Sequence, residues 1–132
     1  MLHVEQLLGS HPHPNGGSAG SVAECVIACL ECASACTSCA DACLADEDVA
    51  RLVACIRLAQ DSAAICRTTA DILSRANHPD SAVVNGIVAA CLTACEACMR
   101  ECWKHALGHC RICAEACAAC ARACEAIIAT MA

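Results

Sequence analysis

Cysteines recur along this chain at alternating intervals of three and four residues, and no other feature constrains its fold as strongly. Over residues 25–43, six cysteines are separated by 4, 3, 4, 3 and 4 positions, and segments 91–102 and 110–124 repeat the pattern. Residues three and four apart lie on one face of an α-helix, and this alternation is the a/d seam of a heptad repeat. Each of the three segments is therefore predicted to be a helix with one face lined by thiols.

Four segments have helical composition, because they are rich in Ala and poor in β-branched runs. The helices are predicted over residues 21–45, 46–75, 81–107 and 109–131. Acidic residues at 46–48 favour a helix start, residues 77–81 form a turn that leads into a cap, and Gly108 ends the third helix. Long helices with short joints favour an all-α fold, an antiparallel up-down-up-down four-helix bundle.

The chain ahead of the bundle is predicted to be a short helical turn over residues 2–8 and a flexible linker. Residues 9–21 are rich in Gly, Ser, Pro and Asn, which break helices and strands. We therefore expect residues 1–20 to be an N-terminal turn and linker, and residues 21–132 to be a four-helix bundle with a cysteine-lined core.

The second helix departs from the cysteine pattern. Its seam runs through Leu52, Cys55, Ala59, Ser62, Cys66, Thr69 and Leu73. Only two of these positions carry sulfur, so this helix is expected to contribute the fewest thiols. On the other helices charged residues such as Glu24 and Arg111 lie opposite the cysteines, which indicates that the cysteine faces point inward.

Composition argues against several classes of function. The chain has one Trp, no Phe and no Tyr, and its formal charge is −6, so it lacks the aromatic platforms and positive charge that nucleic-acid binding uses. Its longest uncharged apolar stretch, residues 81–95, has 15 residues, fewer than the roughly 18 that argue for a membrane span. No Lys or Arg precedes Arg51, so no export signal is recognised and a cytoplasmic location with reduced thiols is expected.

A thiol-lined interior predicts binding of soft metal ions. Thiolates select Cu(I), Zn(II) or iron–sulfur clusters, and cysteines three or four apart on a helix have Cβ atoms about 5–6 Å apart. One ion can therefore be held between consecutive cysteines, and each sulfur can bridge two ions, which suits a row of two-coordinate ions. A metal role is preferred over Cys as a small core residue, because Ala, Val or Leu would fill a core without the risk of oxidation.

Charge favours Cu(I) among these metals. One Cu(I) exchanged for one thiol proton leaves the interior neutral at about one ion per cysteine, whereas a buried Zn(II) with four thiolates carries about −2. The local cysteine run of bacterial ferredoxins is absent from the sequence. The alternatives are a zinc or cadmium thiolate buffer and an iron–sulfur electron carrier. We expect no enzyme, because no cysteine is set apart beside an orienting base.

The three cysteine rows resemble those of the bacterial copper storage proteins. They read C-x3-C-x2-C-x3-C-x2-C-x3-C, then C-x3-C-x2-C-x3-C, then C-x2-C-x3-C-x2-C-x3-C. The resemblance covers residues 20–131 and implies a four-helix bundle that fills its centre with Cu(I), in the cytosolic branch of the family, assembled as a homotetramer. Ala59 and Ser62 depart from it, since sulfur is expected at these seam positions in richer relatives, so the resemblance fixes no stoichiometry.

Two histidines are predicted to extend the ligand row at one end of the bundle. In an up-down-up-down arrangement Cys43, Cys102, His105, His109 and Cys110 meet at the same end. Imidazoles there would pass ions to the thiols, and ordinary polar helix-end residues are the alternative. The opposite end is predicted to be plugged by Val22, Leu73, Val84, Val88, Ile127 and Met131.

The candidate ligands are all the cysteines and two histidines. They are Cys25, Cys29, Cys32, Cys36, Cys39, Cys43, Cys55, Cys66, Cys91, Cys95, Cys98, Cys102, Cys110, Cys113, Cys117, Cys120, Cys124, His105 and His109. The expected function is cytosolic storage or buffering of many Cu(I) ions, about one per cysteine. A copper chaperone or a small-molecule copper donor is the expected partner.

Other residues are predicted to have no ligand role. Met99 is expected to fill the core, and Trp103 to lie on the surface or in a subunit contact. Among the remaining histidines, His11 and His13 lie in the expected linker. His3 and His78 are unassigned.

Overall fold

The computed structural model describes residues 2–12 and 19–130, and these residues form helices and turns without a strand. The elements are α1 (Leu2–Gly9), α2 (Ala19–Leu44), the 3₁₀-helix η2 (Val49–Leu52), α3 (Val53–Leu73), α4 (Ser81–Cys102) and α5 (Gly108–Thr130).

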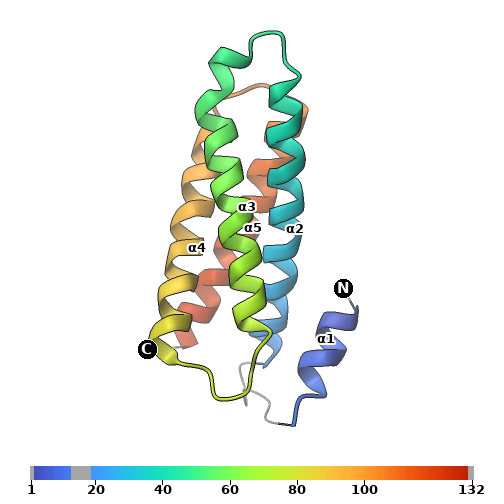
Figure 1. Cartoon of the computed structure of the whole chain (residues 1–132), viewed down its shortest axis with the longest axis vertical. Helices are drawn as coiled ribbons and strands as arrows, with labels where there is room; N and C mark the ends of the chain where they lie inside the picture. The colour runs from blue at the N-terminus through green and yellow to red at the C-terminus, as the bar shows by residue number, and fades with distance from the viewer. Residues whose placement is uncertain (1, 13–18, 131–132) are drawn as a thin grey trace.

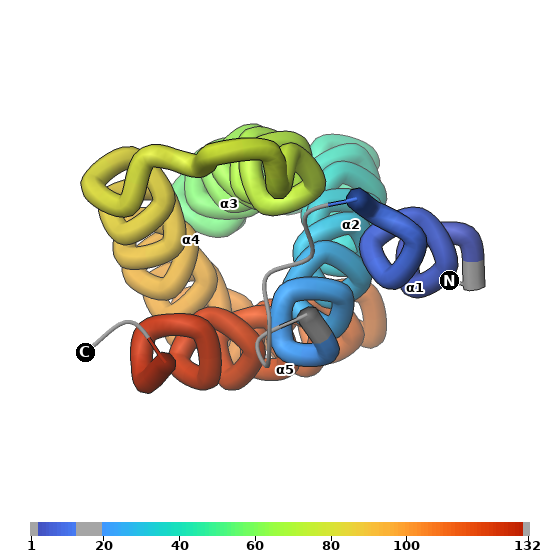
Figure 2. Tube along the Cα trace, turned by 90° about the horizontal axis from the view of Figure 1, so that it is seen from below, coloured from blue at the N-terminus to red at the C-terminus, as the bar shows by residue number. Residues whose placement is uncertain are grey.

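The four long helices stand side by side in alternating directions (Figure 1). Viewed along the bundle axis, α2, α3, α4 and α5 occupy the corners of a square, and α5 closes the ring against α2 (Figure 2). The predicted antiparallel four-helix bundle is confirmed. The short helix α1 lies outside this ring against α2, where Leu8 is buried.

The cysteine faces of the helices form the interior. Every cysteine side chain is 0% exposed except Cys39, at 1%. Large apolar side chains are few inside, with Leu52, Ile127 and Val88 among the largest that are fully buried. Small residues such as Ala114 pack beside the thiols and let the helix backbones approach closely. Thiols therefore take most of the space that Leu and Phe fill in an ordinary bundle.

The second predicted helix begins later than expected, and its first turn is a 3₁₀-helix. We predicted a helix from residue 46, but residues 45–48 form a turn in which the Asp48 backbone N–H donates to Asp46 Oδ1 at 2.8 Å. The 3₁₀-helix η2 follows, and its N-cap residue Asp48 makes no capping hydrogen bond through its side chain. The acidic run thus shapes the turn and does not cap the helix. The predicted cap of the next helix is present, because the Val83 N–H donates to Asp80 Oδ1 at 3.1 Å.

The third predicted helix ends five residues earlier than expected, at Cys102 instead of residue 107. The N–H groups of Lys104 and His105 donate to carbonyls only three residues back, at 3.1 Å each, and this tightening ends the helix. Gly108 was predicted to end α4, but it is the first residue of α5. His105 therefore lies in the connection between α4 and α5.

The two ends of the bundle differ. The histidine end, made by residues 43–52 and 102–110, carries the two candidate imidazoles. At the apolar end Val22, Leu73, Val88 and Ile127 are buried as predicted, whereas Val84 is only half-buried. The sixth predicted member of the plug, Met131, lies outside the described residues.

Two helices are long and apolar enough, by length and composition, to cross a membrane. They are residues 20–44 of α2 and Ser81–Cys102 of α4. In the structure both belong to the bundle and pack through their cysteine faces, although only 28% of the most apolar window of α4 is buried. The search for uncharged apolar stretches missed α4 because it ended the stretch at the first charged residue.

We expect the reduced, metal-free protein to be folded. Its interior thiols are neutral when protonated and pack as small apolar groups, so metal binding adds stability to an existing bundle. Far-ultraviolet circular dichroism of the reduced protein, with a chelator present, should show a strongly helical spectrum. A random-coil spectrum that becomes helical only on adding copper would contradict this expectation.

Candidate metal centre

The interior thiols form a continuous column. Each of the 17 cysteine sulfurs lies within 4.0 Å of another cysteine sulfur or of His109 Nδ1. The shortest Sγ–Sγ distances, 3.6 Å, join Cys29 to Cys120, Cys32 to Cys117, Cys36 to Cys113 and Cys55 to Cys102. All four pairs link different helices. All the cysteines are free thiols.

Within this column the structure gathers sets of soft ligands whose donor atoms all lie within 4.8 Å of one another. Two of these sets share Cys66 of α3, and a third set lies nearer the histidine end. These sets are Cys29, Cys66, Cys91 and Cys120; Cys32, Cys66, Cys95 and Cys120; and Cys36, Cys98, Cys113 and Cys117. Because neighbouring sets share sulfurs or stand in contact, the column favours bridged ions over separate sites.

The α3 side of the column has two hydroxyl groups where the other helices carry thiols. Ser62 is 1% exposed and donates to the Ala94 carbonyl at 3.1 Å, and Thr69 is 0% exposed and donates to the Ile65 carbonyl at 2.8 Å. Both hydroxyls are satisfied by backbone acceptors, and oxygen is a poor ligand for a soft ion. Copper in this part of the interior would therefore be held mainly by α2, α4 and α5.

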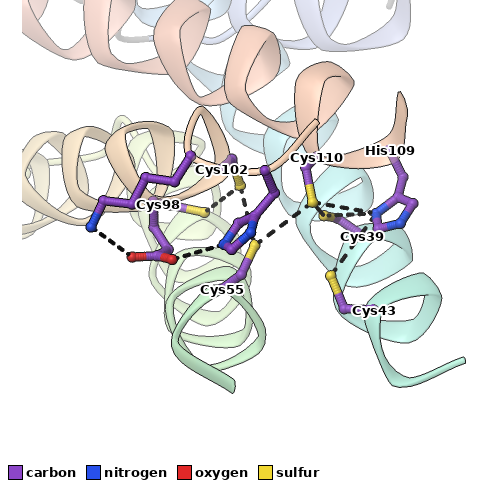
Figure 3. A network of polar contacts seen from close by, with 10 residues as sticks. Cys39, Cys43, Cys55, Cys98, Cys102, His109 and Cys110 are labelled. Atoms are coloured by element: carbon purple, nitrogen blue, oxygen red, sulfur yellow. Dashed lines mark hydrogen bonds and ion pairs between the residues drawn. The ribbon is translucent and has the colours of Figure 1, made fainter. Parts of the chain in front are cut away.

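At the histidine end His109 joins the thiols directly. Its Nδ1 atom lies 3.5 Å from Cys39 Sγ, 3.9 Å from Cys43 Sγ and 3.7 Å from Cys110 Sγ (Figure 3). These four residues form another set of ligands within 4.8 Å of one another. The imidazole reaches the thiols from the first turn of α5 and is half-buried, so it connects the column with solvent.

His105 is held differently from the prediction. We expected it to continue the thiol row of α4, but α4 ends at Cys102 and His105 belongs to none of the ligand sets found among the described residues. Its Nε2–H donates to Glu101 Oε2 at 2.9 Å, and Lys104 Nζ donates to Glu101 Oε1 at 3.2 Å. Sequence reasoning missed Glu101, although its spacing of four residues from His105 was a usable signal.

The thiol pair nearest the apolar end is formed by Cys25 and Cys124, whose sulfurs are 4.0 Å apart. Val22 and Ile127 lie one helical turn further out and are buried. This pair therefore forms the closed end of the column.

Burial controls the ionisation of the thiols near the histidine end. Burial, together with the charges that Cys39 and Cys55 carry when ionised, raises the pKa of Cys43 to about 12. Burial likewise raises the pKa of Cys110. The carboxyl of Glu101 shows the opposite effect, because the hydrogen bond from His105 and then the contact with Lys104 lower its pKa. At neutral pH Cys43 and Cys110 are thus protonated, while Glu101 is ionised.

The residues without a predicted ligand role lie outside the column. His3 is exposed on α1 and His78 is exposed in the α3–α4 turn, where its φ is 54°. His11 is half-buried after α1, and His13 lies outside the described residues. Met99, predicted to fill the core, packs half-buried against it. Trp103, predicted to lie on the surface or in a subunit contact, is 52% exposed.

Comparison with known proteins gives a consistent set of matches. A family model described as "Csp: Copper storage protein" matches residues 18–129. The copper storage protein Ccsp of Streptomyces lividans, in a structure loaded with 10 copper equivalents, is similar with a TM-score of 0.93 and 45% identity, over 96% of this chain and 98% of that chain.

Two further matches come from Bacillus subtilis. The apo form of copper storage protein 3 has a TM-score of 0.68 and 38% identity, over 78% of this chain and 94% of that chain. The cysteine-rich protein YhjQ, described as uncharacterized, is 39% identical over 92 residues, which cover 70% of this chain and 82% of that protein.

We expect the metal-free protein to lose stability as the pH rises above about 9. A thiol in the unfolded chain ionises near pH 9, whereas burial holds Cys43 protonated up to about pH 12. Between these values the unfolded chain has released a proton that the folded chain keeps, so rising pH favours unfolding. Urea unfolding of the reduced protein should show a free energy of unfolding that declines as the pH rises above about 9.

The copper-loaded protein is the control for this measurement. Its thiols are already deprotonated and bound to metal, so its free energy of unfolding should change much less over the same pH range. A metal-free protein with the same stability at about pH 8 and about pH 11 would contradict the assignment of neutral buried thiols.

Proposed function

Because the chain belongs to the copper storage protein family, we propose that its bundle stores many Cu(I) ions on the thiolates of the interior column. The observation that carries this function is the column itself, in which every cysteine contacts another soft donor within 4.0 Å and none is exposed by more than 1%. The ligands we propose are all the cysteines together with His105 and His109. Copper is the cargo of this protein, and we assign it no catalytic step.

The charge of the loaded state favours Cu(I) over other soft ions. Each Cu(I) that replaces a thiol proton adds no net charge to the interior, whereas tetrahedral zinc sites would add about −2 each to a region of low dielectric constant. Glu and Asp do not line the column, since the ligand sets of the described residues contain only Cys and His. The donors are therefore soft, as Cu(I) requires.

A cytosolic location and assembly as a homotetramer are further parts of this proposal. A relative from Streptomyces lividans is described as a cytosolic copper storage protein. The outward face of α4 supports self-association, because Val83 is 56% exposed and a groove beside Leu58 and Ile65 runs along Ala89 and Ala90. Uncovered apolar surface of this kind is typical of a subunit contact.

The proposed copper donor is a protein carrier that docks at the histidine end. Five large apolar side chains are exposed there, from all four long helices or their connections: Leu44, Val49, Val53, Trp103 and Ile112. None of them contributes to the thiol column. A carrier covering this collar would bring its metal next to His109, and the acidic turn at residues 46–48 favours a basic surface on the carrier.

We expect the protein to bind on the order of one Cu(I) per cysteine, because bridging thiolates and charge balance both lead to that ratio. Anaerobic titration with Cu(I) against a competing chelator, followed by metal analysis of the isolated protein, measures it. Replacing both Cys25 and Cys124 by Ala should lower the capacity by about two ions. Saturation of the wild-type protein at three or four ions would favour separate tetrahedral sites and a zinc-type buffer.

We expect copper to enter through the histidine end. His109 contacts three thiols there, whereas Val22 and Ile127 at the apolar end offer a metal ion no ligand. The double variant His105→Ala/His109→Ala should load more slowly in stopped-flow measurements and still reach nearly the wild-type capacity.

The matched control alters the apolar end. Val22→Ala/Leu73→Ala removes buried methyl groups, so it should lower the free energy of unfolding, by about 1–5 kcal/mol, without slowing uptake. An unchanged uptake rate in the histidine double variant would remove the histidine entrance and leave the storage function intact.

A further inference from the structure

Glu101 is an acidic side chain with an unusually complete set of contacts at the histidine end. It belongs to the last turn of α4, and its side chain is 14% exposed. One carboxylate oxygen accepts from His105 Nε2–H at 2.9 Å, and the other is contacted by Lys104 Nζ at 3.2 Å. The His105 side chain is only 8% exposed, whereas that of Lys104 is 68% exposed. The carboxylate thus has both oxygens occupied and its orientation fixed.

The chemistry of this contact determines which nitrogen of His105 is open to a metal ion. An ionised carboxylate only accepts hydrogen bonds, so the proton of the contact belongs to Nε2. A neutral imidazole carries one ring proton, and its other nitrogen, here Nδ1, keeps the lone pair that a metal needs. His109 also faces its thiols through Nδ1. Both imidazoles of the histidine end are then available for metal through the same ring atom.

His105 follows Cys102, the last thiol of α4, by three residues. Its N–H donates to the Cys102 carbonyl at 3.1 Å. Cys102 Sγ in turn lies 3.6 Å from Cys55 Sγ and 3.9 Å from Cys98 Sγ. Figure 3 shows these three cysteines on one side and His109 with Cys39, Cys43 and Cys110 on the other. The two groups meet, because Cys55 Sγ lies 4.0 Å from Cys110 Sγ, so they belong to the same column.

We propose that Glu101 is a positioning residue for copper uptake, which holds His105 by its Nε2–H so that Nδ1 receives Cu(I) and passes it to Cys102. This inference rests on the proposed storage function. Glu101 itself does not bind the ion, because carboxylate is a hard ligand and both its oxygens are engaged. Carboxylates that hold a metal-binding histidine in this way raise the basicity of the ring and fix its orientation.

Uptake kinetics of three variants test this role. Glu101→Ala removes the acceptor, Glu101→Gln keeps an oxygen that accepts from Nε2–H, and Glu115→Ala removes an exposed carboxylate of α5 with the same change in net charge. Loading from a Cu(I)–chelator complex should slow by about tenfold in Glu101→Ala. Glu101→Gln should recover most of the rate, and Glu115→Ala should load as the wild type does. All four proteins should keep the wild-type capacity and helical content.

A spectroscopic measurement separates positioning from a merely structural contact at the helix end. Long-range ¹H–¹⁵N spectra of the protein with ¹⁵N-labelled histidine, at one added equivalent of Cu(I), report which ring nitrogen of His105 binds metal. Wild type and Glu101→Gln should show copper at Nδ1, and Glu101→Ala should show both nitrogens in use. Copper at Nε2 of the wild type, or wild-type uptake by Glu101→Ala, would overturn the proposal.

The experiments distinguish a failure of this inference from a failure of the storage function. If Glu101→Ala loads normally while the protein still binds about one Cu(I) per cysteine, only the role of Glu101 is wrong. If the capacity of the wild type is three or four ions, the storage function itself fails, whatever the rate.

Discussion

Contact among neutral thiols inside the bundle is the interaction on which the rest of the structure depends. A buried thiol packs as a small apolar group while protonated and becomes a soft ligand when it exchanges its proton for a metal ion. Because every cysteine is at most 1% exposed, the same side chains serve as hydrophobic core in the empty protein and as ligands in the loaded one. The exchange of one proton for one Cu(I) leaves the charge of this core unchanged, so the bundle can fill without an electrostatic penalty.

This double use of the thiols explains why Ala, and few large apolar residues, accompany them in the core. A core of Leu and Phe would hold the helices further apart and separate the sulfurs, whereas Ala beside the thiols brings sulfurs of different helices to 3.6 Å. Larger apolar residues are confined to the ends and the periphery of the column, such as Leu52 and Ile127. The two ends then have different roles, since at one end a half-buried imidazole contacts the thiols, whereas at the other end buried aliphatic side chains cover the last thiol pair.

The sequence predicted the helices and their inward faces because a heptad pattern depends only on backbone periodicity. Helix ends were predicted less well, since they depend on local hydrogen bonds that periodicity does not encode. The N–H groups after Cys102 tighten the chain and end α4, and the Asp46 side chain forms a turn before η2. The same limit affected the site: His105 was placed on the thiol row because α4 was extended through it. Its contact with Glu101, four residues earlier in the chain, was not predicted.

The most direct test of the central claim is a crystal structure of the copper-loaded protein with anomalous diffraction measured on both sides of the copper absorption edge. The thiol column predicts a continuous row of copper peaks along the bundle axis, from the Cys25–Cys124 pair to the set around His109, with each ion between two or three sulfurs. Copper peaks on the surface of the bundle, or a few isolated peaks each surrounded by four sulfurs, would contradict it.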